Sequence, residues 1–169
     1  LDLAIDGTGF FQVLLPSGEL VYTRNGAFSR NDEGLLTTSS GFIIQPEIAI
    51  PAEATKINVS ADGIVSVQIP EQVEAQEVGQ LQLANFQNLT GLQPIGENFF
   101  VESIASGPPI LENPFVAGFG KIVQGSLEAS NVNVVQELVD MIETQRAYEV
   151  NSKAISSVDE MLRFISNNL

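Results

Sequence analysis

The last stretch of the chain, residues 133–169, constrains the fold most because it contains neither proline nor glycine. Apolar or tolerant residues recur along it at alternating spacings of four and three, apart from one three-three step at residues 155 and 158. This spacing places their side chains in one narrow stripe of an α-helix, like the seam of a coiled coil. The pattern therefore predicts one long helix from residue 133 to about 166.

Asn133 is placed to cap this helix, because its side-chain oxygen can accept a backbone N–H two or three residues further on. At about 1.5 Å per residue the helix would reach roughly 50 Å, more than a small β domain needs to cover one face. No second helical pattern of comparable length is present, so the stripe requires a partner helix. We define the seam as the residues expected to mediate assembly rather than to fill a monomer core: Val134, Leu138, Met141, Tyr148, Ile155, Leu162 and Ile165.

Composition excludes several function classes. The 169 residues, 44% of them hydrophobic, suit one folded domain plus an appendage. The net charge of −14 repels phosphates and makes nucleic acid an unsuitable partner. Cysteine and histidine are both absent, which removes disulfides, thiolate metal sites and the commonest general base. No apolar run approaches the 18 or so residues that a membrane span needs, so we expect no membrane insertion.

Residues 1–128 have the pattern of short antiparallel strands. Apolar, β-favouring runs flank turn signals at 16–19, 31–34 and 61–63, as in β-hairpins. Further strands are expected at 41–45, 78–86, 99–103 and 121–128, with a loop at 46–56 crossing between sheets and a Pro/Gly-rich connector at 105–120. We therefore predict a mainly β fold, a sandwich or open barrel of short antiparallel strands, with one long C-terminal α-helix. The β-rich domain would cover 1–128 and the helical part 129–169.

Three patterns that could carry chemistry have simpler structural interpretations. Gly7-Thr8-Gly9 resembles the start of a dinucleotide loop, but position 12 is Gln and no helix follows, which favours a turn. Asn31-Asp32-Glu33-Gly34 lacks the later acidic positions of a calcium loop. The 21 acidic residues are scattered over turns, and none is marked as part of a buried glycosidase pair. We therefore expect no catalytic, cofactor-binding or metal site, and no enzyme.

Several segments resemble flagellar rod and hook proteins. In the C-terminal part these are Ser130-Asn131-Val132-Asn133-Val134, Glu137-Leu138-Val139, Gln145-Arg146-Ala147-Tyr148-Glu149 and Asn151-Ser152-Lys153-Ala154. At the start they are Leu1-Asp2-Leu3-Ala4-Ile5, Gly7-Thr8-Gly9-Phe10-Phe11-Gln12-Val13 and Tyr22-Thr23-Arg24-Asn25-Gly26-Ala27-Phe28. The segments that resemble the distal rod members are Ala61-Asp62-Gly63-Ile64-Val65-Ser66-Val67, Gly91-Leu92, Ile95-Gly96-Glu97-Asn98 and Gln124-Gly125-Ser126-Leu127-Glu128.

The resemblance implies a structural role in the basal body of the bacterial flagellum. In that family the N-terminal and C-terminal helices pack with each other and with neighbouring subunits as the inner tube of a helical homopolymer. The β domain forms the outer layer, between the export channel and the ring bushing. Expected partners are copies of the same protein, neighbouring rod and hook proteins and the ring. The resemblance also implies type III export, a periplasmic location and a shaft that transmits torque to the hook.

Two other classes remain open from the residues alone. One is a secreted β module that binds a carbohydrate or protein ligand and carries a helical oligomerisation tail; the other is a glycosidase with a buried carboxylate pair. The chain opens at Leu1 inside an alternating pattern, Leu1, Leu3 and Ile5, so we expect a fragment that lacks the family's N-terminal helix. An upstream heptad-like helix would favour the rod, and a cleavable signal peptide would favour the secreted module.

Overall fold

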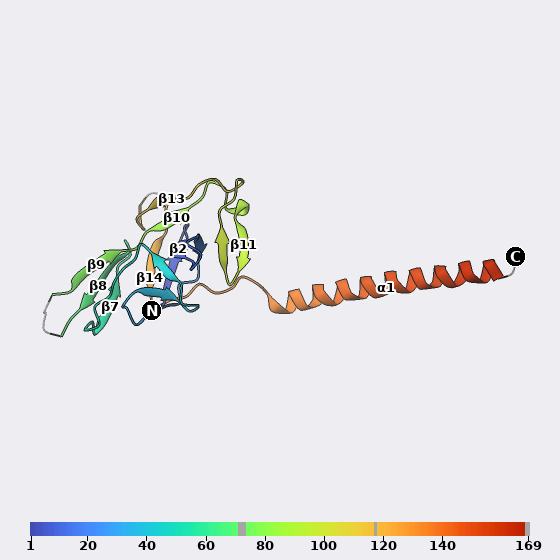
Figure 1. Ribbon diagram of the computed structural model, residues 1–169, viewed down its shortest axis with the longest axis horizontal. Helices are drawn as coiled ribbons and strands as arrows, with labels where there is room; N and C mark the ends of the chain where they lie inside the picture. Colours follow the sequence, from blue (N-terminus) through green and yellow to red (C-terminus); the bar gives the residue numbers. More distant parts are fainter. Residues whose placement is uncertain (71–73, 117, 168–169) are drawn as a thin grey trace. The chain divides into compact units, whose positions relative to one another are not determined.

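The computed structural model describes residues 1–70, 74–116 and 118–167, with side chains described as far as residue 163. The chain divides into two compact units, Leu1–Glu128 and Ala129–Leu169. The first, called the β unit below, is built from antiparallel strands, and the second contains the helix α1 (Val134–Asn167). The predicted fold class is confirmed: several antiparallel sheets and one C-terminal helix, with no closed barrel among the described residues (Figure 1).

A seven-stranded sheet organises the β unit, with strand order β11-β12-β3-β2-β6-β5-β4. Its strands are β2 (Phe11–Leu14), β3 (Leu20–Thr23), β4 (Phe28–Arg30), β5 (Leu36–Thr38), β6 (Ile43–Gln45), β11 (Gln93–Gly96) and β12 (Phe99–Val101). A three-stranded sheet holds β7 (Lys56–Val59), β8 (Ile64–Gln68) and β9 (Gln76–Gln80), which lie side by side in Figure 1. Two further pairs are β1 (Leu3–Asp6) with β14 (Lys121–Gln124), and β10 (Leu83–Asn85) with β13 (Ile110–Glu112).

The three predicted hairpins are present. β2 pairs with β3, β4 with β5, and β7 with β8, all antiparallel. The β4–β5 turn is held by Asn31, whose Oδ1 accepts the backbone N–H of Glu33 at 3.0 Å and of Leu35 at 2.8 Å. The predicted Asp-Gly turn between β7 and β8 uses Gly63 at a φ of +82°, a conformation that favours glycine. Local turn chemistry therefore sets these hairpins, as the sequence pattern indicates.

The main hydrophobic core lies between the sheets, because strands of all four contribute to it. It includes Phe11 of β2, Val65 of β8, Leu83 of β10 and Ile122 of β14, each almost completely buried. A smaller aromatic cluster forms around Phe10, Tyr22 and Phe86, with Tyr22 and Phe86 edge to face at 4.8 Å between ring centroids. Such a core needs all four sheets at once, which explains why the loop at 46–56 crosses from one sheet to another.

The prediction of a single strand at 78–86 is wrong, because two strands, β9 and β10, occupy this region. Alternation continues through Leu81 and Leu83 because both side chains are fully buried in the main core, but the backbone changes partner between them. β9 pairs with β8, then the N–H of Leu81 donates to the carbonyl of Gly63 at 2.8 Å, and β10 pairs with β13. Side-chain periodicity therefore persists across a break that only the hydrogen bonds reveal.

Two strands were not predicted. β11 contains Pro94 and exposes every side chain, so it carries no apolar alternation and pairs only with β12 at the sheet edge. β13 lies inside the predicted connector at 105–120, directly after Pro108 and Pro109, and is also exposed throughout. Both strands are held by backbone pairing rather than by burial, so the hydrophobic pattern of the sequence does not predict them.

Candidate assembly surface

Helix α1 begins where the sequence predicts, because Asn133 caps it. The Oδ1 atom of Asn133 accepts the backbone N–H of Val135 at 3.1 Å and of Gln136 at 3.4 Å. Its carbonyl accepts the N–H of Glu137 at 3.1 Å, the first helical hydrogen bond. These are the N–H groups that a helix leaves without an internal partner, so the cap fixes the start of the helix. None of the described helical residues forms a segment both long and apolar enough to cross a lipid bilayer.

The seam is exposed along the described part of the helix. In its own unit α1 is the sole element among the described residues, so these side chains have nothing in that unit to pack against. Exposed fractions are 66% for Val134, 51% for Leu138, 55% for Met141, 77% for Tyr148, 68% for Ile155 and 59% for Leu162. The side chain of Ile165 lies outside the described residues. Rows of large exposed apolar groups are common at interaction surfaces, and the assembly role of the seam stays a prediction.

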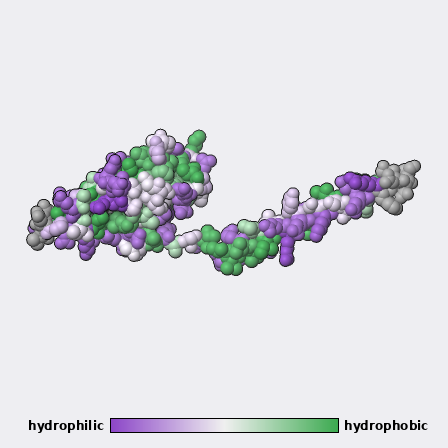
Figure 2. All heavy atoms as spheres, turned by 60° about the horizontal axis from the view of Figure 1, so that its bottom comes forward, coloured by the Kyte–Doolittle hydropathy of each residue, from purple (hydrophilic) through white to green (hydrophobic). Residues whose placement is uncertain are grey.

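Sequence reasoning missed the width of the apolar face near the helix start. Val135, Val139 and Ile142 are also exposed, at 70%, 44% and 50%, and lie in a second stripe beside Val134 and Leu138. Figure 2 shows the resulting hydrophobic region in the first turns of the helix, followed by mostly polar surface. The sequence contains a signal for this second stripe, because Val135, Val139 and Ile142 have the same four-three spacing as Val134, Leu138 and Met141, shifted by one residue.

A second cluster, centred on Arg24, joins distant segments of the β unit. Its Nη1 donates to the carbonyls of Gly7 at 3.1 Å and Gly9 at 2.9 Å, and its Nη2 donates to Ile5 and again to Gly7, both at 3.1 Å. The guanidinium carbon also lies 5.8 Å from the ring centroid of Phe10. These acceptors lie in β1, at Ile5, and in the connection from β1 to β2, at Gly7 and Gly9, and Arg24 therefore holds this segment in place.

The Gly7-Thr8-Gly9 segment is thus a structural turn, as the sequence analysis favours. Gly7 has a φ of +123°, and a Cβ there would approach the Cα of Gly120 to 2.7 Å. The N–H of Gly120 donates to the carbonyl of Thr8 at 2.8 Å. The glycines allow two backbone segments to touch. Within the described residues no group of three or more acidic or other metal-ligating side chains is placed to hold a metal ion.

Segments near both ends of the chain match known protein families. Residues 4–67 match the flagellar hook protein FlgE/F/G D1 domain, and residues 123–169 match the C-terminal region of the flagellar basal body rod FlgEFG proteins. The first match contains most of β1 and of β8, the strands between them and Arg24. The second contains the last two residues of β14, Glu128, Asn133 and the whole seam.

Relatives cover nearly the whole chain. The flagellar basal-body rod protein FlgG of Buchnera aphidicola subsp. Acyrthosiphon pisum is 52% identical over 165 residues, 98% of this chain and 64% of the relative. FlgG of Caulobacter vibrioides is 51% identical over 166 residues, 98% of this chain and 63% of the relative. The FlgF rod protein of Caulobacter vibrioides is 36% identical over 96% of this chain and 62% of the relative. The chain thus spans a little under two thirds of the relatives it matches, and it belongs to the flagellar hook and basal-body rod protein family.

Proposed function

We propose that this chain is the greater part of a structural subunit of the distal rod of the bacterial flagellum, a protein without enzymatic activity. The observation that carries the proposal is the 52% identity to a basal-body rod protein over 98% of the chain. The higher identity to FlgG than to FlgF of Caulobacter vibrioides favours the FlgG role within the family.

In this proposal the seam of α1 packs against helices of the same protein and of neighbouring copies. Burying a leucine side chain such as Leu138 contributes about 1.5–3 kcal/mol, and the seam repeats that gain along the helix. The wide apolar face at Val135, Val139 and Ile142 would supply a second contact in the first turns. A helix that uses several faces can bind more than one neighbour, which a helical polymer requires.

The β unit would then form the outer layer of the rod. Its partners would be neighbouring rod and hook proteins and the surrounding ring, and its location the periplasmic part of the basal body, reached by type III export. Function is mechanical in this proposal: closely packed helices resist twisting, so the polymer transmits torque to the hook. The helix cap at Asn133 and the core of the β unit contribute by holding each subunit in one shape.

A chimera tests the proposal. The chain would replace the matching 166-residue segment of the Caulobacter vibrioides FlgG protein, in cells that lack their own copy. We expect swimming motility and complete basal bodies in electron micrographs. A matched chimera carrying the corresponding segment of the Caulobacter FlgF relative is the control and should not restore motility. A stable, exported chimera that never enters basal bodies would contradict the proposal.

A further inference from the structure

A groove lies on the β unit, and its lining residues are not members of the Arg24 cluster. It combines two adjoining hollows of about 400 and 490 Å³, which share Glu102 and Pro108 as lining residues. One wall is the β2–β3 turn with Glu19 and Leu20, and the other is the chain after β12. Glu102 follows β12 and Leu20 begins β3, two strands paired through Phe100 and Tyr22, so the walls are held by the sheet itself.

The loop that closes the groove is rigidly built. The Oγ of Ser103 donates to the carbonyl of Gly91 at 2.6 Å and accepts the N–H of Ala105 at 3.1 Å. Ser106, almost completely buried, accepts the N–H of Ser103 on its Oγ at 2.9 Å. This network leaves the Ile104 side chain fully exposed at the mouth of the groove. The groove is therefore preformed, and its apolar rim costs little to order on binding.

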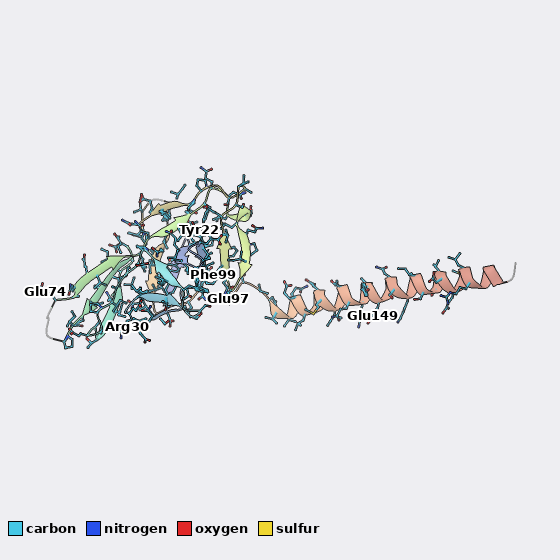
Figure 3. All side chains as sticks on the ribbon, viewed as in Figure 1. Tyr22, Arg30, Glu74, Glu97, Phe99 and Glu149 are labelled. Carbon is cyan, nitrogen blue, oxygen red and sulfur yellow. The ribbon has the colours of Figure 1, made fainter. Side chains whose placement is uncertain are left out.

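Tyr22 lies at the floor of the groove with an unused polar group. The residue is 2% exposed and its ring packs on Phe86. Its hydroxyl has no hydrogen-bond partner among the described residues, and none of their fully buried side-chain polar atoms is unpaired, so this hydroxyl reaches the surface of the groove. Figure 3 labels Tyr22 and also Phe99, which come from the neighbouring strands β3 and β12. A ligand in the groove can therefore hydrogen-bond to this hydroxyl in place of water.

The charges around this hydroxyl select the ligand. Glu19 and Glu102 line the same hollow, and the negative charge of Glu102 is close enough to contribute to the raised pKa of Tyr22. Leu20, Pro108 and Pro109 add apolar walls. A hydroxyl oxygen, two carboxylates and an apolar lining suit a long basic side chain, whose stem packs on apolar surface while its head group meets acidic oxygens.

The β unit of a second copy is poorly suited to supply that side chain, and the other three bases of the chain, Arg146, Lys153 and Arg163, lie on α1, which in the proposed function packs against other helices. The β unit has four basic residues against 15 acidic ones. Arg24 bridges Glu128, Lys121 bridges Asp6 at 3.1 Å, and Arg30 donates to the carbonyl of Pro51 at 3.3 Å, which leaves Lys56. We propose that the groove binds a lysine or arginine side chain of a basic partner protein, with Glu19 and Glu102 meeting its charge and the Tyr22 hydroxyl oxygen accepting a hydrogen bond.

The test is a nuclear magnetic resonance titration of the 169-residue chain with Nα-acetyl-lysine methylamide. We expect saturable shifts of the amide resonances of Leu20, Tyr22 and Glu102, and none with the uncharged norleucine analogue. Glu102→Gln should weaken binding about two- to fivefold, the effect of losing one partly solvated ion pair. Tyr22→Phe should also weaken it while leaving the packing on Phe86 intact.

Glu77→Gln is the matched control, since Glu77 is an exposed acid of β9 outside the groove. It should leave the affinity unchanged. Equal weakening by Glu77→Gln and Glu102→Gln, or shifts spread evenly over the acidic surface, would overturn the proposal. The same resonances shifting with protein concentration alone would identify a second copy as the occupant and also overturn it.

Discussion

Nε of Arg24 donates a 2.7 Å hydrogen bond to Oε2 of Glu128, a residue 104 positions later in the chain. Arg24 directly follows β3, and Glu128 is the last residue of the β unit. Because the same guanidinium also binds the carbonyls of Ile5, Gly7 and Gly9, one side chain ties together the β1–β2 connection, β3 and the end of the unit.

Replacing Arg24 with lysine should lower the free energy of unfolding of the β unit by about 1–3 kcal/mol. Lysine keeps the charge but cannot present a planar fork to several acceptors. Urea denaturation measures the change. Arg30→Lys is the control, because Arg30 makes one hydrogen bond, to Pro51, and should change stability by less than about 0.5 kcal/mol. Equal losses in the two variants would contradict the role given to Arg24.

Replacing Asn133 with alanine should destabilise the start of α1 by about 1 kcal/mol, because two N–H groups lose their acceptor. A helix without tertiary partners is marginal, so the helical signal in circular dichroism should fall visibly. Asn133→Asp should retain it. Asn131→Ala, two residues earlier and outside the helix, serves as the control. An unchanged spectrum for Asn133→Ala would show that the helix does not depend on this cap.

Changing Leu138 and Leu162 together to aspartate should abolish rod assembly in the chimera described above. The two side chains contribute roughly 3–6 kcal/mol per subunit if fully buried in the assembly. The thermal melt of the β unit should be unchanged, because both residues lie in the other unit. Gln136→Asp with Ser157→Asp adds the same charge at polar positions of the helix and should assemble. If the β unit unfolds while mutant rods still form, the seam belongs to a monomer core.

The stability of the β unit should decrease between pH 10 and pH 12 because of Tyr22. Burial, and secondarily the charge of Glu102, raises the pKa of Tyr22 from 10 to about 12. The unfolded chain therefore loses the tyrosine proton at lower pH than the folded chain, so the stabilisation is complete below pH 10 and is lost above it. Urea denaturation against pH measures the loss.

The measurement is made in a Tyr148→Phe background, which leaves Tyr22 as the sole tyrosine. Tyr22→Phe in that background should flatten the decline. Glu102→Gln should lower the pKa of Tyr22, which the absorbance of tyrosinate reports directly. A pH profile that Tyr22→Phe leaves unaltered would contradict the assignment.

Gly26→Ala should destabilise the β unit by about 1–3 kcal/mol or more, as overpacking does. A Cβ at Gly26 would lie 1.7 Å from the carbonyl oxygen of Leu3, next to the hydrogen bond from the N–H of Leu3 to Gly26. Gly41→Ala has open space and suffers only from its φ of +86°, so about 1 kcal/mol is expected. Calorimetry of both variants checks the ranking, and a reversed order would contradict it.

The sequence predicts those elements whose cause is local. The Asn133 cap, the Asn31 turn and the Asp62-Gly63 turn each depend on a side chain or glycine acting within a few residues, and all three were anticipated. The break after Gln80 and the exposed strand β13 depend on backbone partners far along the chain, and neither was anticipated. The exposed strand β11 pairs with its neighbour β12 but has no apolar alternation, and it was not anticipated either. The position of Tyr22 beside Glu102 requires the pairing of β3 with β12, which no local sequence pattern predicts.

The pairing of β1 with β14 has a mechanical consequence. Leu3 lies opposite Gln124, and the strands run antiparallel, so both chain ends of the β unit leave from the same end of this two-stranded ladder. A force that separates those ends first loads the hydrogen bonds of Leu1 with Phe28 and of Gly125 with Asp2. It then loads the ladder one hydrogen bond at a time from Leu3 and Gln124, with Arg24 and Glu128 beside it. Phe28 begins β4, so the seven-stranded sheet shares this tension at its edge strand. Tension through the main chain is thus borne where the two ends of the β unit meet.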